Sequence, residues 1–189
     1  MDYTIEDRIK LIIEAVKKET GINPVKVFNR IAHNDFVRIH GPEHHILDGS
    51  ALLTAFYNAG GNIDLEKGIE YIAKEGARMP GAMCGYWGVC GAVTSVGAAL
   101  SFIDSTGPLS TDGNWGKHME HTSKALLGLS KTKGPRCCKR DGYIALETAV
   151  DFLNENYSVK IECEKIKCSF YPKNEQCIKE RCPFYYGEA

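Results

Sequence analysis

The eight cysteines of this 189-residue chain fall into three groups, and their thiols are its most obvious source of chemistry. Two bracket a glycine-rich segment, Cys84-Gly-Tyr-Trp-Gly-Val-Cys90, and two are adjacent, Cys137 and Cys138. The remaining four form a quartet near the C-terminus: Cys163, Cys168, Cys177 and Cys182. Thiolates bind soft metals, carry iron–sulfur clusters and act as nucleophiles in redox and sulfur chemistry. The grouping indicates a class of chemistry and leaves the substrate open.

The quartet has the spacing Cys-x4-Cys-x8-Cys-x4-Cys, which puts four soft ligands within twenty residues, from Cys163 to Cys182. We predict a metal site made of all four, either a tetrahedral zinc ion or an iron–sulfur cluster. The alternative is four reduced, buried thiols. The last three resemble the zinc finger of three cysteines and one histidine, but Tyr186 stands near the place of that histidine. Cys163 is therefore the expected fourth ligand, and RNA binding, the usual role of that finger, is disfavoured.

Three body cysteines, Cys90, Cys137 and Cys138, stand at predicted helix starts. Because helix N-termini stabilise thiolates, we expect these thiols to be more reactive than an ordinary cysteine. The last two lie in a stretch, residues 131–140, that has five basic residues and no acidic one. A basic loop at a helix start suits an anion, and a solvated basic loop is the alternative. The candidate anion-binding residues are Lys133, Arg136, Lys139 and Arg140.

Three histidines stand close together in the run His40-Gly-Pro-Glu-His-His45. If a helix begins at Pro42, His44 and Asp48 share one face, and a carboxylate there would fix the tautomer of the histidine and raise its basicity. Capping or surface roles remain open for each histidine alone. As a cluster they favour function, and we predict one site at converging helix starts. Its candidate catalytic residues are His40, His44, His45, Cys84, Cys90, Cys137 and Cys138.

The composition is that of an ordinary globular domain: 43% hydrophobic, 25% charged, with a net charge of -1. This charge gives no general attraction to nucleic acid or anionic membranes. The first residues lack the apolar core of a signal peptide, so we expect a cytoplasmic, reducing location in which structural disulfides are disfavoured. The uncharged segment 79–103 is long enough to span a bilayer, but its proline and glycines favour a buried loop followed by a helix.

Apolar residues recur at helical spacing along most of the chain, and no alternating strand pattern stands out. We predict an all-α bundle of about seven helices, near residues 4–20, 25–32, 42–58, 64–77, 89–103, 115–129 and 134–156. Residues 1–157 would form the helical domain, and residues 158–189 a short cysteine-rich, metal-binding tail packed on it. On the sixth predicted helix, His118 and His121 are three residues apart and could face one site.

Four segments together resemble an uncharacterised domain family of anaerobic prokaryotes: His40-Gly-Pro-Glu-His-His-Ile-Leu-Asp-Gly-Ser-Ala-Leu-Leu, Cys84 to Ala92, Gly134-Pro-Arg-Cys-Cys, and the quartet. The resemblance covers most of the chain. Members are sometimes joined to methyltransferase-like domains, which implies a methyltransferase as a partner, and the family has no settled activity. A shorter run, Gly88-Val-Cys90-Gly-Ala-Val-Thr94, is similar to the Cys-Gly-Ala-Val motif of small helical proteins assigned to redox chemistry.

These observations lead to a cytosolic cysteine-rich metalloprotein that performs redox or sulfur-transfer chemistry, with a second metal or cluster allowed in the helical body. A small anionic substrate and a redox partner are the expected partners, without a membrane. Two alternatives stay open. One is a zinc-binding module that recognises RNA or a partner protein, with RNA less favoured by the net charge. The other is an accessory domain to a separately encoded methyltransferase.

Overall fold

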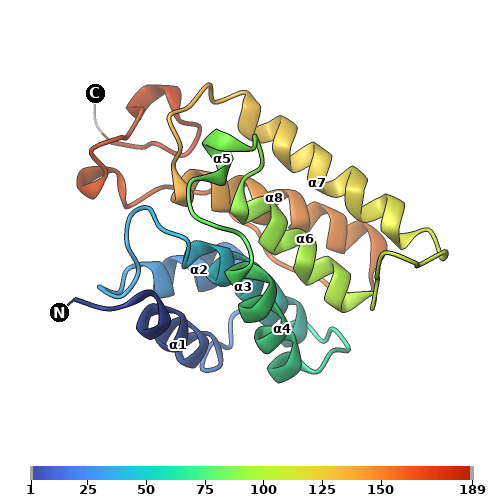
Figure 1. The fold of residues 1–189 in the computed structure, drawn as a ribbon. Helices are drawn as coiled ribbons and strands as arrows, with labels where there is room; N and C mark the ends of the chain where they lie inside the picture. The colour runs from blue at the N-terminus through green and yellow to red at the C-terminus, as the bar shows by residue number, and fades with distance from the viewer. Residues whose placement is uncertain (1, 188–189) are drawn as a thin grey trace.

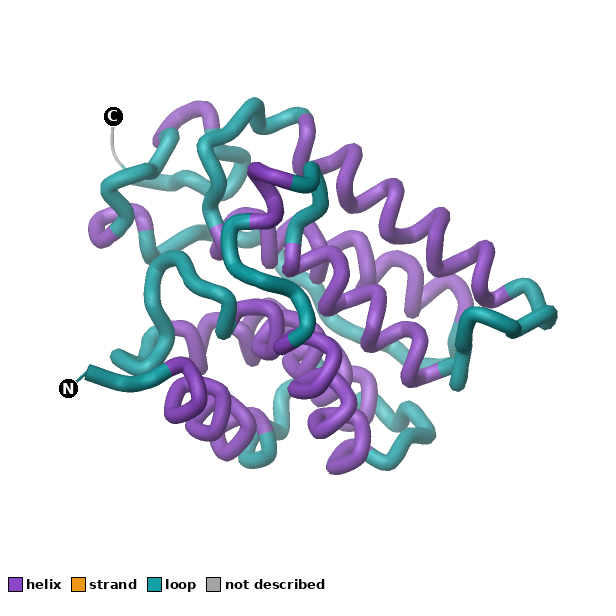
Figure 2. Tube along the Cα trace, viewed as in Figure 1, coloured by secondary structure: helices purple, strands orange, loops and turns teal. Residues whose placement is uncertain are grey.

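The computed structural model describes residues 2–187, and within them it contains helices and no strand. The helices are α1 (Ile5–Val16), α2 (Pro24–Ala32), α3 (His44–Asn58), α4 (Leu65–Ala77), α5 (Met83–Tyr86), α6 (Gly91–Ile103), α7 (Asn114–Ser130) and α8 (Cys138–Asn156), followed by the short 3-10 helices η1 (Tyr171–Lys173) and η2 (Lys179–Arg181). The all-α prediction is confirmed, and seven of these helices match the predicted ones. The eighth, α5, is a four-residue helix in the glycine-rich segment and is too short to show a period (Figure 2).

Helix α3 lies at the centre of the fold and packs against α1, α2, α4, α6 and α8 (Figure 1). Its sequence is apolar or small on nearly every face, which is typical of a buried helix. Helices α6, α7 and α8 pack on one another as a second group. None of the helices within residues 2–187 combines the length and the apolar character needed to cross a bilayer.

Two glycines bring α3 and α6 into close contact, side by side. A Cβ on Gly49 would lie 2.6 Å from the backbone oxygen of Ser95, and a Cβ on Gly91 would collide with the ring of His45. The Gly49 N–H also donates to Ser95 Oγ over 2.8 Å. Since His45 meets Gly91 and Gly49 meets Ser95, the two helices run parallel and start at the same end of the molecule.

Helix α8 starts at that same end. A Cβ on Gly142 would lie 2.6 Å from the Asp48 carboxylate of α3, and the Cys90 thiol at the start of α6 donates to Asp141 Oδ2 over 3.8 Å. The predicted convergence of helix starts is therefore present. Helix α3 begins two residues later than predicted, because Pro42 and Glu43 form the preceding turn.

The tail, residues 157–187, folds back along α8 to the start of that helix (Figure 1). Asn154 anchors its first part, since its side chain exchanges two hydrogen bonds with the Ile161 backbone, at 2.8 and 3.0 Å. Farther along, Phe170 stacks on His33 with ring centroids 4.3 Å apart, and Phe184 packs edge-on against Tyr143 at 5.2 Å. These aromatic side chains are buried in the same core as the helices.

Candidate functional site

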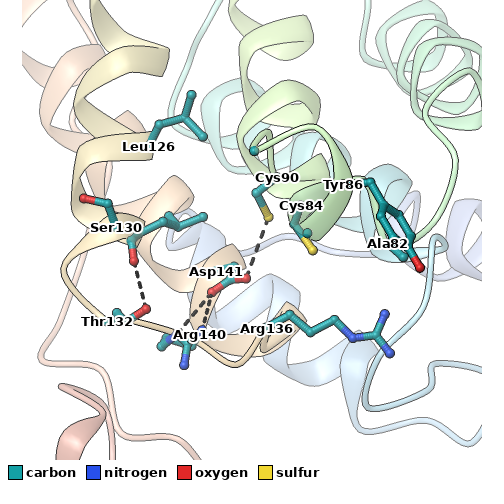
Figure 3. A pocket seen from close by; sticks show the side chains of 14 residues that line it. Ala82, Cys84, Tyr86, Cys90, Leu126, Ser130, Thr132, Arg136, Arg140 and Asp141 are labelled. Carbon is teal, nitrogen blue, oxygen red and sulfur yellow. Dashed lines mark hydrogen bonds and ion pairs between the residues drawn. The ribbon is translucent and has the colours of Figure 1, made fainter.

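An inner cavity of about 50 Å³ lies where α3, α6 and α8 begin. Its chemically active lining residues are Cys84, Cys90, Cys138, His44, His45, Asp48, Asp141 and Arg136. An open cleft of about 670 Å³ adjoins it, and Cys84, Cys90 and Arg136 line both spaces. Figure 3 shows Cys84 and Cys90 beside each other at this cleft, with Asp141 next to the Cys90 sulfur, Arg140 beyond Asp141, and the Arg136 side chain extending away from the thiols. Five of the seven predicted catalytic residues therefore meet at one place.

His45 has a free nitrogen at this cavity. Its Nδ1 donates to the Met79 carbonyl over 3.1 Å, which leaves the Nε2 lone pair for a proton or a metal. Gly91 makes room for the ring, because any larger residue there would displace it. Burial lowers the pKa of His45, so the ring is neutral near pH 7.

His44 faces a different set of neighbours. His44 Nε2 lies 3.0 Å from the Arg38 carbonyl and 3.2 Å from the Lys139 ammonium, which itself donates to that carbonyl over 3.1 Å. His44 Nδ1 is buried and has no partner among residues 2–187. Burial, together with the charge of Lys139, lowers the pKa of His44 to about 3. His44 is therefore a neutral ring at the cavity wall.

Asp48 is the least expected group here. Its side chain is 0% exposed, and neither carboxylate oxygen has a hydrogen-bond partner in the described part of the chain. Burial raises the pKa of Asp48 well above its usual value, and the nearby Asp141 adds to the rise. The predicted pairing of His44 with Asp48 is wrong as a hydrogen bond. The two side chains line the same cavity, but His44 Nε2 contacts the Arg38 carbonyl and the Lys139 ammonium instead.

The thiols at the helix starts do not have lowered pKa values. Burial raises the pKa of Cys138 to about 12, and it also raises those of Cys90 and Cys137. The negative charge of Asp141 adds to all three increases. The expectation of reactive thiolates is wrong for the cavity as it stands, because dehydration and neighbouring carboxyls outweigh the helix N-termini.

The adjacent cysteines face two different spaces. Cys138 lines the inner cavity, whereas Cys137 lines a smaller cavity of about 20 Å³ between the start of α8 and the tail. Three tail cysteines line this second cavity with it: Cys168, Cys177 and Cys182. Between the two spaces, His40 accepts from the Cys138 N–H over 3.4 Å and donates through Nε2 to Asn174 Oδ1 over 3.1 Å. His40 and Cys137 thus lie outside the inner cavity.

Cys163, the first member of the predicted quartet, lies apart from the other three. Its side chain is exposed, its sulfur bonds to the neighbouring Glu164 carbonyl over 3.9 Å, and it does not line the small cavity. Burial raises its pKa to about 11. The negative charges of Glu147 and Asp151, which lie in the middle of α8, contribute to the same rise. Anywhere in residues 2–187, the side chains as placed bring no three ligating groups close enough to hold one metal ion.

The four predicted anion-binding residues are also divided. Arg136 and Arg140 line the open cleft. Lys139 is 0% exposed, with its ammonium 4.7 Å from the centre of the Phe170 ring. Lys133 is exposed and lines neither the cleft nor the inner cavity.

Asp141, Met79 and Asn174 were not anticipated from the sequence, and Asp48 was anticipated only as a partner of His44. A signal existed for Asp48, since it is a carboxylate in an otherwise apolar helix. The His118 and His121 pair lies elsewhere: His118 binds Asp104 over 2.8 Å, and the His121 ring packs on Phe152 at 5.3 Å.

The family model described as "Family of unknown function (DUF5714)" matches residues 12–185. The chain belongs to this family. No curated protein and no solved structure matched it. The membership confirms the expectation of an uncharacterised family, whereas the anaerobic hosts and the methyltransferase association remain predictions.

Proposed function

We propose that this DUF5714 protein carries out redox or sulfur-transfer chemistry on a small anionic substrate, at the thiols of its inner cavity. The observation that supports this most is the meeting of Cys84, Cys90 and Cys138 with the free Nε2 of His45 in one enclosed space. Cys84 and Cys90 also line the open cleft, so they are the thiols that a substrate in the cleft would reach.

The roles follow from the contacts. His45 is placed to accept a thiol proton through Nε2, because its Nδ1–H is already committed to the Met79 carbonyl. Arg136 and Arg140 line the cleft, and the exposed Arg136 would neutralise an anion there. Arg136 is exposed and free to adapt, while Arg140 is fixed by the Pro135 carbonyl at 2.8 Å and by Asp141.

A metal in this cavity is part of the proposal. Two thiols, an imidazole and a carboxyl group form a donor set that suits zinc or iron, and neither oxygen of Asp48 has a hydrogen-bond partner in the described part of the chain. Because no three of these groups lie close enough for one ion, the side chains would have to move to hold it. Cys90, Cys138, His45 and Asp48 would then be the ligands, and His45 Nε2 would bind the ion in place of accepting a proton. When bound, such an ion would supply positive charge and keep the thiols as thiolates.

The alternative of RNA recognition receives less support. Two of the five cations in the basic stretch, Lys139 and Arg140, are buried and cannot contact a phosphate backbone. Recognition of a partner protein or a methyltransferase remains a prediction that these contacts neither favour nor oppose.

The test is anaerobic purification with zinc, iron and sulfide analysis, followed by reaction with a persulfide donor or a mild disulfide oxidant. Mass spectrometry would locate the modified cysteines. Cys90→Ser should slow sulfur or electron uptake at least about tenfold, because it removes a nucleophile. Cys163→Ser, at the exposed cysteine, is the matched control and should react at the wild-type rate. Equal rates for Cys90→Ser and wild type would contradict the proposal.

A further inference from the structure

Four thiols from two distant parts of the chain line the small cavity between α8 and the tail. No three of them lie close enough for one ion, so the side chains would have to turn inward to share it. We propose that Cys137, Cys168, Cys177 and Cys182 hold a thiolate-bound metal centre, either zinc or an iron–sulfur cluster, and that Cys163 is not a ligand. This deepens the proposed function by naming the ligands of a second centre. The fourth ligand, Cys137, comes from the helical domain. It replaces Cys163, which the spacing along the tail predicted.

Two of these sulfurs accept hydrogen bonds from N–H donors. The Lys179 N–H donates to Cys177 Sγ over 3.4 Å, and the Asn174 amide donates to Cys137 Sγ over 3.5 Å. At Cys168, the backbone N–H groups of Phe170 and Tyr171 oppose the rise in the pKa of the thiol. A neutral thiol is a weak acceptor, whereas a metal-bound thiolate is a strong one and usually receives such bonds.

Around Cys137 and Cys168 the backbone N–H groups two and three residues after the cysteine oppose the rise in its pKa, those of Lys139 and Arg140 and those of Phe170 and Tyr171. Cys177 has one such donor two residues on. This spacing is that of a local capping turn, and Cys90 has the same relation to Ala92. Such turns place N–H groups where they would support metal-bound thiolates.

The wall of this cavity suits a buried anionic centre. Lys139 and Arg140 both line it and supply positive charge opposite the sulfurs. Tyr143, Phe170 and Phe184, which are all buried, complete an aromatic lining that limits access of water. Low solvent access strengthens the attraction between thiolates and a metal ion.

Cys163 is held away from this place by its own anchors. The Ile161 backbone is fixed to Asn154, and Glu164 pairs with Lys26 at 2.6 Å. Its acidic neighbour Glu147 is ten positions beyond Cys137, which corresponds to about 15 Å along a helix. To become a ligand, Cys163 would have to leave both anchors.

The test compares Cys137→Ser with Cys163→Ser in the full-length protein, purified anaerobically. Zinc, iron and sulfide per chain are measured for each. We expect Cys163→Ser to keep the wild-type content and Cys137→Ser to lose the metal of one centre. A brown, sulfide-containing wild type would identify a cluster, and a colourless zinc protein would identify a single ion. Loss of metal from Cys163→Ser with retention in Cys137→Ser would overturn the inference.

Thiol alkylation of the wild-type protein covers the case in which Cys137→Ser fails to fold. Iodoacetamide should label Cys163 with or without a metal chelator, and should label Cys168, Cys177 and Cys182 only after chelation. Protection of Cys163 by the metal, or labelling of the three others before chelation, would overturn the inference. Failure of the proposed function appears separately, as an unaltered rate of sulfur or electron uptake in Cys90→Ser.

Discussion

The inner cavity and the small tail cavity both contain cysteines, but the hydrogen-bond partners of their sulfur atoms differ, although backbone N–H groups oppose the rise in pKa at Cys90 as well as at Cys137. In the inner cavity Cys90 donates to the carboxylate of Asp141, and Asp48 lies on the same wall. In the tail cavity Cys137 and Cys177 accept from N–H groups. Carboxylates keep a thiol protonated, whereas N–H donors favour the thiolate. Cysteines therefore have two different surroundings in this protein. The adjacent Cys137 and Cys138 lie one in each, Cys137 in the tail cavity and Cys138 in the inner cavity.

The largest expected effect is on the tail, through removal of the metal. Residues 162–187 contain only two short 3-10 helices, and Ile166, Phe170 and Phe184 are their share of the common core, so chelation should loosen them and speed their proteolysis at least about tenfold. The helical circular dichroism should stay nearly constant, since most residues of that core belong to the helices. Time-resolved proteolysis with mass spectrometry measures this. Unfolding of the helices together with the tail would show that the two regions are not separate in stability.

Asp48→Asn tests the role of the carboxyl groups in the inner cavity. In metal-free protein the change removes a buried, unpartnered acid, and we expect about 1–3 kcal/mol of added stability in urea unfolding. Zinc or iron affinity of the inner cavity should fall about 10- to 100-fold, as for other supporting groups of a metal site. Thr54→Val, at another buried and unpartnered residue of α3, is the control for packing and should leave metal affinity unchanged. A less stable Asp48→Asn protein with unchanged affinity would contradict this view.

Acid sensitivity is expected at the α7–α8 contact, in addition to that of the buried His44 in the inner cavity. Burial lowers the pKa of His121 to about 4, whereas the unfolded chain binds the proton near 6.5. Stability should therefore fall by up to about 3 kcal/mol as the pH drops from about 6.5 to about 4. His121→Leu should flatten that part of the pH–stability curve, measured by urea unfolding at several pH values. A curve as steep as that of the wild type would assign the acid sensitivity to other groups.

The smallest effect concerns one N–H donor in the tail cavity. Asn174→Ala removes the hydrogen bond to Cys137 Sγ and the contact with His40, worth about 1 kcal/mol together. A chelator should then remove the metal about fivefold to tenfold faster, as followed by absorbance or by a zinc-responsive dye. Asn156→Ala, at the far end of α8, is the matched control. An unchanged rate would mean that the donors are not needed by the sulfur.

The helices were predictable because their apolar period is long and their starts are marked by capping residues, as at Thr4 and Asp64. The convergence of Cys90, Cys138 and His45 was predictable because each of them stands at or near a predicted helix start. The division of Cys137 from Cys138 did not follow, because neighbouring residues at a helix start point in different directions and only packing decides what each meets. Spacing also failed for Cys163, since the path of a loop is set by anchors such as Asn154.

Gly91 has no functional group, yet it decides where His45 lies. With Gly49 against Ser95 one turn farther on, it holds α3 and α6 in a fixed register. Cys138, likewise, is carried by the start of α8. Cys84 differs, because its support is the four-residue α5, which sits between the left-handed backbone positions Ala82 and Gly88. The cavity therefore has one wall of interlocked long helices and one thiol on a short segment, so sequence changes near residues 82–88 can retune reactivity without disturbing the core.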